Sequence, residues 1–66
     1  MSLTKAQKET LEFIKQNEVF LDKEKTIHYN AFTKTRKWNK TFDILLQNGH
    51  IYKASLRTNN VRIKAL

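Results

Sequence analysis

The second half of the chain carries the pattern that most narrows the folds open to it. Apolar residues recur at helical spacing over residues 36–48, Gly49 follows, and residues 51–56 and 61–66 then alternate between apolar and polar. Glycine is favoured just past the end of a helix because it adopts positive φ without steric cost. The pattern therefore predicts a helix, its end at Gly49, and a β-hairpin after it.

One side of the predicted helix is apolar and the other is largely charged. At 100° per residue, a single stripe holds Trp38, Phe42, Leu45 and Leu46. We expect Trp38 to anchor the core, because it shares this stripe. The opposite side holds Arg36, Lys37, Lys40, Asp43, Ile44 and Gln47, with Asn39 on the flank.

The hairpin is predicted to have one apolar and one basic face. The apolar face follows if Leu56 pairs with Val61, Ala54 with Ile63, and Tyr52 with Ala65. The four-residue loop is then Arg57, Thr58, Asn59 and Asn60, where asparagine tolerates positive φ. The other face carries Lys53, Ser55, Arg62 and Lys64.

The first part of the chain begins with a helix signal. Thr4 and Gln7 have the spacing of a capping box, in which each side chain bonds to the backbone amide of the other residue. A helix over about 5–17 is expected, with an apolar side made of Leu3, Ala6, Thr10, Leu11, Phe13 and Ile14.

The middle of the chain permits several readings. Residues 19–21 and 26–29 form two short strands around the charged turn DKEK, or only one of them does. Asn30 is a candidate helix N-cap, followed by a short helix near 31–35, a turn and a second helix from about 37. The same apolar spacing also permits one continuous helix, and periodicity does not separate these alternatives.

Charge is distributed unevenly along the chain. Residues 1–24 hold four lysines against five acidic residues, a net charge of −1. Residues 25–66 hold nine basic residues against Asp43 alone, a net charge of +8. A one-sided positive surface favours binding to a polyanion, because each phosphate neutralised by Lys or Arg releases condensed counterions.

Size and composition exclude several classes of protein. The 66 residues make one domain with a small core, and without cysteine there is neither a disulfide framework nor a cysteine zinc site. His28 and His50 lack neighbours at metal spacing, and no phosphate-cradling glycine loop or nucleophile–base pair is present, so we expect no metal, no cofactor and no enzyme activity. The longest apolar runs are too short to span a bilayer, so an intracellular, cytoplasmic or nucleoid-associated location is expected.

The segment FDILLQNGHIYKASLRTNNVRIKAL resembles the end of a winged helix-turn-helix domain. The shared features are the helix, the exit Leu46–Gln47–Asn48–Gly49–His50–Ile51, and a strand, wing and strand. The opening LTKAQKETLEFIKQN is similar to the first helix of that family. The family's second helix is replaced here by the polar stretch TIHYNAFTKTRKW. The expected fold is therefore a small α+β winged helix over residues 1–66, and an α-β-β-α-β-β order is the second choice.

The resemblance implies a sequence-specific double-stranded DNA-binding protein, such as a small transcriptional regulator or an accessory factor for recombination or replication. It implies that the helix over 36–48 enters the major groove and that the wing reaches the backbone or the minor groove. The implied contacts are Arg36, Lys37, Asn39, Lys40, Thr41, Asp43 and Gln47 on the helix, and Lys53, Arg57, Thr58, Asn59, Asn60, Arg62 and Lys64 around the wing. A single small module buries little surface, so a homodimer or cooperative multimer on DNA is expected.

Two further classes of function fit the same residues. A protein-interaction module or inhibitor would dock an acidic partner through the charged helix side, where Asp43 and Ile44 are unusual for DNA reading. An RNA or single-stranded nucleic-acid binder would stack bases on an exposed tyrosine, Tyr29 or Tyr52, beside lysines.

Overall fold

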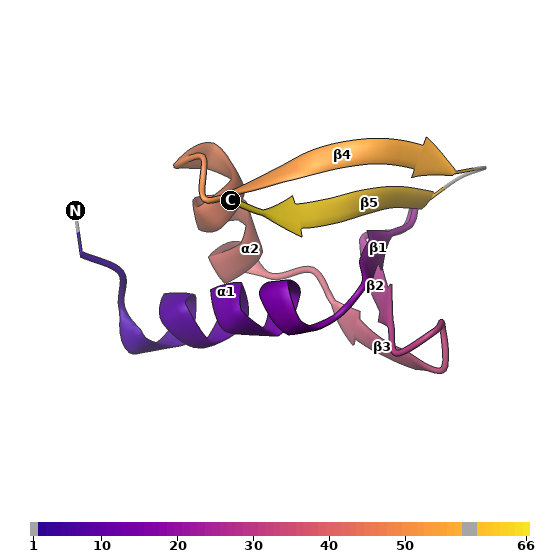
Figure 1. Ribbon diagram of the computed structural model, residues 1–66, viewed down its shortest axis with the longest axis horizontal. Coiled ribbons are helices and arrows are strands. Elements are labelled where there is room, and N and C mark those ends of the chain that lie inside the picture. Colours follow the sequence, from indigo (N-terminus) through magenta and orange to yellow (C-terminus); the bar gives the residue numbers. More distant parts are fainter. Residues whose placement is uncertain (1, 58–59) are drawn as a thin grey trace.

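The fold consists of two helices and five strands within the described part of the chain (Figure 1). A computed structural model describes residues 2–57 and 60–66, with the backbone alone at 56 and 57. In chain order the elements are α1 (Lys5–Gln16), β1 (Val19–Leu21), β2 (Thr26–Tyr29), β3 (Lys34–Lys37), α2 (Lys40–Gln47), β4 (Ile51–Arg57) and β5 (Asn60–Ala65).

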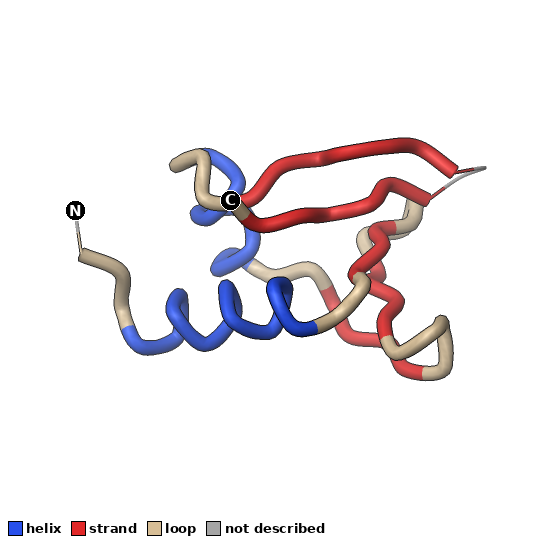
Figure 2. The backbone as a smooth tube through the Cα atoms, viewed as in Figure 1, coloured by secondary structure: helices blue, strands red, loops and turns tan. Residues whose placement is uncertain are grey.

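The strands make one antiparallel sheet in the order β3-β2-β1-β5-β4. Pairing of β1 with β5 joins the early strands to the late hairpin, whose strands β4 and β5 run along the long axis of the molecule beside α1 (Figures 1 and 2). Both helices pack on the same side of that hairpin, where α1 contacts α2 and β5, and α2 contacts β4. One face of the sheet is therefore covered by helices and the other is not.

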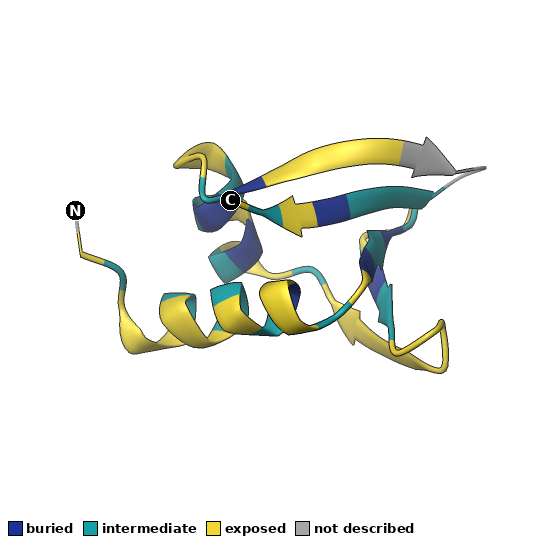
Figure 3. Ribbon diagram, in the orientation of Figure 1, coloured by how far each residue is buried: buried dark blue, intermediate teal, exposed yellow. Residues whose placement is uncertain are grey.

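The core lies between the helices and the covered face of the sheet (Figure 3). Strand alternation places Val19, Leu21, Ile27 and Ile63 on this face, because the register pairs Val19 with Ile63 and Leu21 with Ile27. The buried residues come from both helices and four strands: Ile14, Val19, Leu21, Ile27, Phe42, Leu45, Ile51 and Ile63. The strand β3 contributes none of them, since all four of its residues are exposed.

The expected start of the first helix and the expected end of the second are confirmed. The Gln7 amide donates to the Thr4 hydroxyl at 3.2 Å, and the Thr4 amide donates to the Gln7 side chain at 3.0 Å. Gly49 follows α2 with φ of 80°, its amide bonds to the Leu46 carbonyl, and the His50 amide bonds to the Leu45 carbonyl. These paired bonds form a Schellman motif, which satisfies carbonyls at the helix end.

The prediction of a helix near 31–35 is wrong, whereas the two strands at 19–21 and 26–29 are confirmed. Asn30 begins a tight turn instead of capping a helix, and residues 34–37 form β3. The helix predicted from 36 or 37 begins at Lys40, because the Asn39 side chain accepts bonds from the amides of Thr41 and Phe42. The apolar spacing before that cap was coincidental.

The predicted hairpin is confirmed, but its register is correct at only one end. Leu56 pairs with Val61 as expected, and a β-bulge between Lys53 and Ser55 then shifts the rest. As a result Tyr52 pairs with Lys64 rather than Ala65, and Ile63 pairs with Lys53 rather than Ala54. One extra residue in a strand reverses which side chains face the core. Arg57 and Asn60, the outer residues of the predicted four-residue loop, are also paired with each other. The two residues between them, 58–59, lie outside the described chain.

The chain is thus a small α+β domain with an antiparallel sheet. Winged-helix topology is not confirmed, and the observed α-β-β-β-α-β-β order differs from the second choice by the added strand β3. Neither helix in the described residues is long and apolar enough to cross a membrane.

Candidate nucleic-acid interface

The side of the sheet that the helices do not cover carries the polar and aromatic side chains that alternate, along each strand, with core residues. We call this side the open face. By strand register it carries Phe20, His28, Thr35, Lys37, Tyr52, Ser55, Arg62 and Lys64. None of these side chains is buried, so the open face is accessible across all five strands.

Three rings form an aromatic cluster on the open face: Phe20, His28 and Phe32. Phe20 and Phe32 stack with ring centroids 4.9 Å apart and an interplanar angle of 22°. The His28 ring lies 5.8 Å from Phe32. Phe32 remains 52% exposed, although an aromatic side chain is usually buried when the core has room for it.

The turn that presents Phe32 is strained. Asn30, Ala31 and Phe32 all have positive φ, between 54° and 67°. Left-handed backbone costs about 1–2 kcal/mol for residues other than glycine, with asparagine the best tolerated. The turn is closed by bonds from the Thr33 amide and hydroxyl to the Asn30 carbonyl. Strain of this kind persists where the surrounding structure holds it in place. Here the strained turn places the Phe32 ring over the Phe20 ring.

His28 is fixed at the open face by Asp22. The His28 Nε2 lies 2.7 Å from Asp22 Oδ2, while Asp22 Oδ1 accepts bonds from the amides of Glu24 and Thr26. The hydrogen bond with His28, followed by the bond with the Thr26 amide, lowers the pKa of Asp22 below its ordinary value. This carboxylate therefore organises the β1–β2 turn and orients one ring of the aromatic cluster.

Arg62 lies beside the cluster on the neighbouring strand. Its register partner on β1 is Phe20, and its guanidinium carbon is 5.4 Å from the centroid of that ring. Arg62 Nη1 bonds to Glu18 Oε2 at 3.2 Å, whereas Arg62 Nε is shielded from solvent and has no hydrogen-bond partner in the described structure.

Tyr52 and Lys64 extend the open face along the hairpin. They are register partners, and Lys64 lies two residues beyond Arg62 on β5. Tyr52 is 41% exposed, which leaves a second ring available. Tyr29, the other tyrosine considered from the sequence, packs edge-on against Phe13 at 4.7 Å on the covered side. Of the two, Tyr52 is therefore the one on the open face.

The residues expected on one reading helix are separated in space. Arg36 and Lys37 belong to β3, and the Arg36 guanidinium lies 4.5 Å from the Phe13 ring. Asn39 caps α2 with its side chain. These three residues therefore do not lie on the surface of α2, where the sequence predicted them. Arg36 and Lys37 belong to the strand before the helix, and Asn39 caps its first turn.

The remaining helix residues form a small surface of mixed charge. On α2, Lys40, Asp43 and Gln47 are exposed and Thr41 is half-buried. The Asp43 carboxylate accepts a 2.6 Å bond from Trp38 Nε1, so it holds the half-buried indole that stacks on Phe42. This contact gives Asp43 a structural role that its sequence position did not reveal.

The residues expected around the wing have mixed placements. Arg62 and Lys64 lie on the open face, Lys53 is exposed beside the bulge, and Asn60 is half-buried where β5 begins. Arg57 is placed by its backbone only, opposite Asn60. Thr58 and Asn59 lie outside the described residues.

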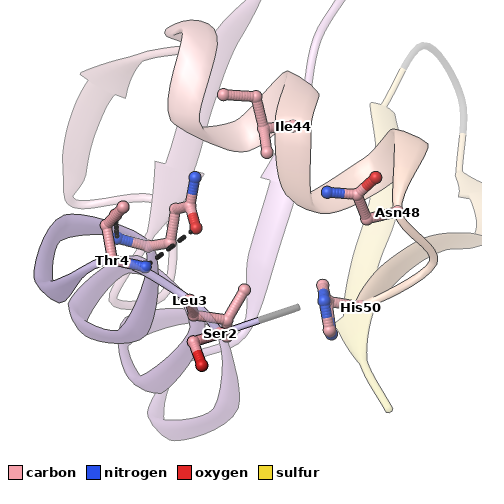
Figure 4. A pocket seen from close by; sticks show the side chains of 7 residues that line it. Ser2, Leu3, Thr4, Ile44, Asn48 and His50 are labelled. Carbon is pink, nitrogen blue, oxygen red and sulfur yellow. Dashed lines mark hydrogen bonds between the residues drawn. The ribbon is translucent and has the colours of Figure 1, made fainter.

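A separate hollow lies between the N-terminal segment, α2 and the start of β4 (Figure 4). It is lined by Ser2, Leu3, Thr4, Gln7, Ile44, Asn48 and His50. The side chains of Thr4 and Gln7 are occupied by the capping box, as the dashed bonds show. Its lining includes no Lys, Arg, Asp or Glu, so the hollow lacks the charged anchors that would hold an ionic ligand.

Sequence reasoning missed Phe20, His28 and Phe32 as site residues. Alternation offered a signal for Phe20, which stands between two core residues and must therefore face away from them. Nothing in the pattern indicated a left-handed turn at Phe32. Within the described residues, no group of three or more metal-ligating side chains gathers.

Comparisons of the chain with protein-family models, curated proteins and solved structures find no match.

Proposed function

We propose that this protein binds single-stranded nucleic acid, RNA or DNA, across the open face of its sheet. The observation that carries the proposal is the placement of exposed Phe32 and Tyr52 on one uncovered surface with Arg62 and Lys64. Proteins that bind single strands combine aromatic side chains, on which bases stack, with basic residues that follow the backbone. Bases paired inside a duplex do not offer their faces to such rings.

The distribution of charge supports the sheet over the helix as the binding surface. The open face carries Lys37, Arg62 and Lys64, and the whole chain has a formal charge of +7. Glu18 offsets Arg62 there, which leaves Lys37 and Lys64. On the exposed side of α2, by contrast, the single Lys40 is offset by Asp43. A polyanion gains more from the surface where basic residues outnumber acids.

Fluorescence anisotropy with labelled single-stranded RNA, single-stranded DNA and duplex DNA of matched length tests the proposal. Phe32→Ala and Tyr52→Ala should each weaken single-strand binding by about 5- to 150-fold, as stacking on one ring contributes about 1–3 kcal/mol per base. Leu66→Ala is the matched control, because Leu66 is 81% exposed and lies past the end of β5. Equal affinity of all three variants and the wild type would contradict the proposal.

Duplex DNA is the second candidate, and the confirmed hairpin favours it. The pair β4–β5 carries Lys53, Arg62 and Lys64, and β4 is an edge strand of the sheet (Figure 1). A basic hairpin can contact phosphates on both sides of a groove. In the same assay, tighter binding of duplex than of either single strand, with no loss in Phe32→Ala, would select this candidate.

A further inference from the structure

We infer that the hollow beside Arg62 is a subsite for one backbone phosphate, and that the Glu18 carboxylate occupies it as a tethered competitor. This inference rests on the proposed function and names the residues that would hold one phosphate of the bound nucleic-acid strand. The hollow is lined by Glu18, Phe20, Ser55 and Arg62.

Arg62 has the geometry of a phosphate ligand. Ser55 and Arg62 are register partners on adjacent strands, so a hydroxyl and a guanidinium lie side by side on the open face. One guanidinium nitrogen, Nη1, contacts Glu18, and Nε is shielded from solvent without a hydrogen-bond partner in the described structure. A planar guanidinium presents donors in a fork that matches phosphate oxygens. An oxyanion that replaces Glu18 in the hollow would take over the bond from Nη1, beside the Ser55 hydroxyl on the adjacent strand.

Glu18 is suited to leave when a strand binds. Its side chain is 72% exposed, against 25% for Arg62, and it belongs to the short link between α1 and β1. An ion pair this exposed changes an equilibrium by about 5-fold or less. A phosphate of a longer strand can replace that carboxylate, since neighbouring contacts add to its own. Once displaced, Glu18 also repels the strand.

A neighbouring hollow indicates which way the bound nucleic acid would run from Arg62. A second hollow, which shares Glu18 and Phe20 with the first, runs to Asn30, Ala31 and Phe32 on the strained turn. A phosphate at Arg62 thus lies next to the ring pair of Phe20 and Phe32, where an adjoining base would stack.

Charge neutralisation at Glu18 tests the subsite. Glu18→Gln should tighten binding of a labelled single-stranded oligonucleotide of mixed sequence by about 2- to 5-fold. Glu12→Gln is the matched control, because it makes the same change in net charge on an exposed part of α1. It should change affinity much less than Glu18→Gln, since its carboxylate is outside the hollow.

The gain must also depend on Arg62. We expect Glu18→Gln to lose its advantage when it is combined with Arg62→Ala or with Arg62→Lys, which keeps the charge but loses the fork. Circular dichroism melts of each variant verify folding, and the lysine variant serves if the alanine variant does not fold.

The outcomes separate this inference from the proposed function. Equal gains from Glu18→Gln and Glu12→Gln, or a gain that persists in both Arg62 backgrounds, would overturn the phosphate subsite while leaving single-strand binding intact. Failure of the wild type and every variant to bind any single strand would overturn both.

Discussion

The exposed side of α2 and the open face of the sheet are both polar surfaces of this protein, but they relate to the fold differently. Side chains near α2 serve the structure, since Asn39 caps the helix and Asp43 holds Trp38. On the open face, Phe32 and Tyr52 are large, exposed and not needed to fill the core. Residues that the fold does not use, particularly apolar ones left in solvent, are the better indication of a binding surface.

The sharpest test of this comparison is a pair of phenylalanine truncations. Phe42 is 1% exposed in α2, and Phe42→Ala should cost about 3–5 kcal/mol, close to the whole stability of a chain this short. Phe32→Ala should cost far less, because it loses mainly one exposed ring contact worth about 0.5–1.5 kcal/mol. Urea unfolding followed by circular dichroism measures both. Similar losses would show that Phe32 is structural.

Two lysine truncations compare the surfaces as sites for a polyanion. Lys64→Ala on the open face should lower single-strand affinity several-fold and reduce the slope of log affinity against log salt by about 0.7, the value for one released phosphate contact. Lys40→Ala on α2 should leave that slope nearly unchanged. Anisotropy titrations from 50 to 300 mM salt provide the slopes. The reverse ranking would return the site to the helix.

Backbone strain differs between the two regions as well. Gly49→Ala should destabilise by about 1 kcal/mol, because φ is 80° there and no atom lies within 4 Å of the added Cβ to compensate. Ala31→Gly should instead stabilise by up to about 1 kcal/mol, since it relieves positive φ in the turn under Phe32. Thermal melts of both variants show the sign. If Ala31→Gly also weakens binding, the rigid turn contributes to the site.

The smallest effect concerns pH. The pKa of Asp22 is lowered in the folded protein, so its contribution to stability is present above the unfolded value of 3.8 and is lost as pH falls through the lower folded pKa. Asp22→Asn should therefore reduce the dependence of the melting temperature on pH below about pH 4. Melts from pH 2.5 to 6 of wild type and variant make the comparison. Identical profiles would show that the hydrogen bonds with His28 and the Thr26 amide do not lower the pKa of Asp22.

Local signals in the sequence were sufficient where a short segment decides its own conformation. The capping box at Thr4 and Gln7, the helix end at Gly49 and the existence of the late hairpin all follow from side-chain chemistry within a few residues. The same reasoning failed between Asn30 and Asn39. Apolar spacing there fits a helix by coincidence, and the cap that starts α2 competes with an equally plausible one nine residues earlier.

The sequence by itself determined that the chain is a small, basic α+β domain with its positive charge in the second half. Only the tertiary structure decided which side chains share a surface. The bulge between Lys53 and Ser55 and the pairing of β1 with β5 place Phe20, Arg62 and Tyr52 on one face. Pairing between distant strands depends on burying the core as a whole, and no local pattern records it.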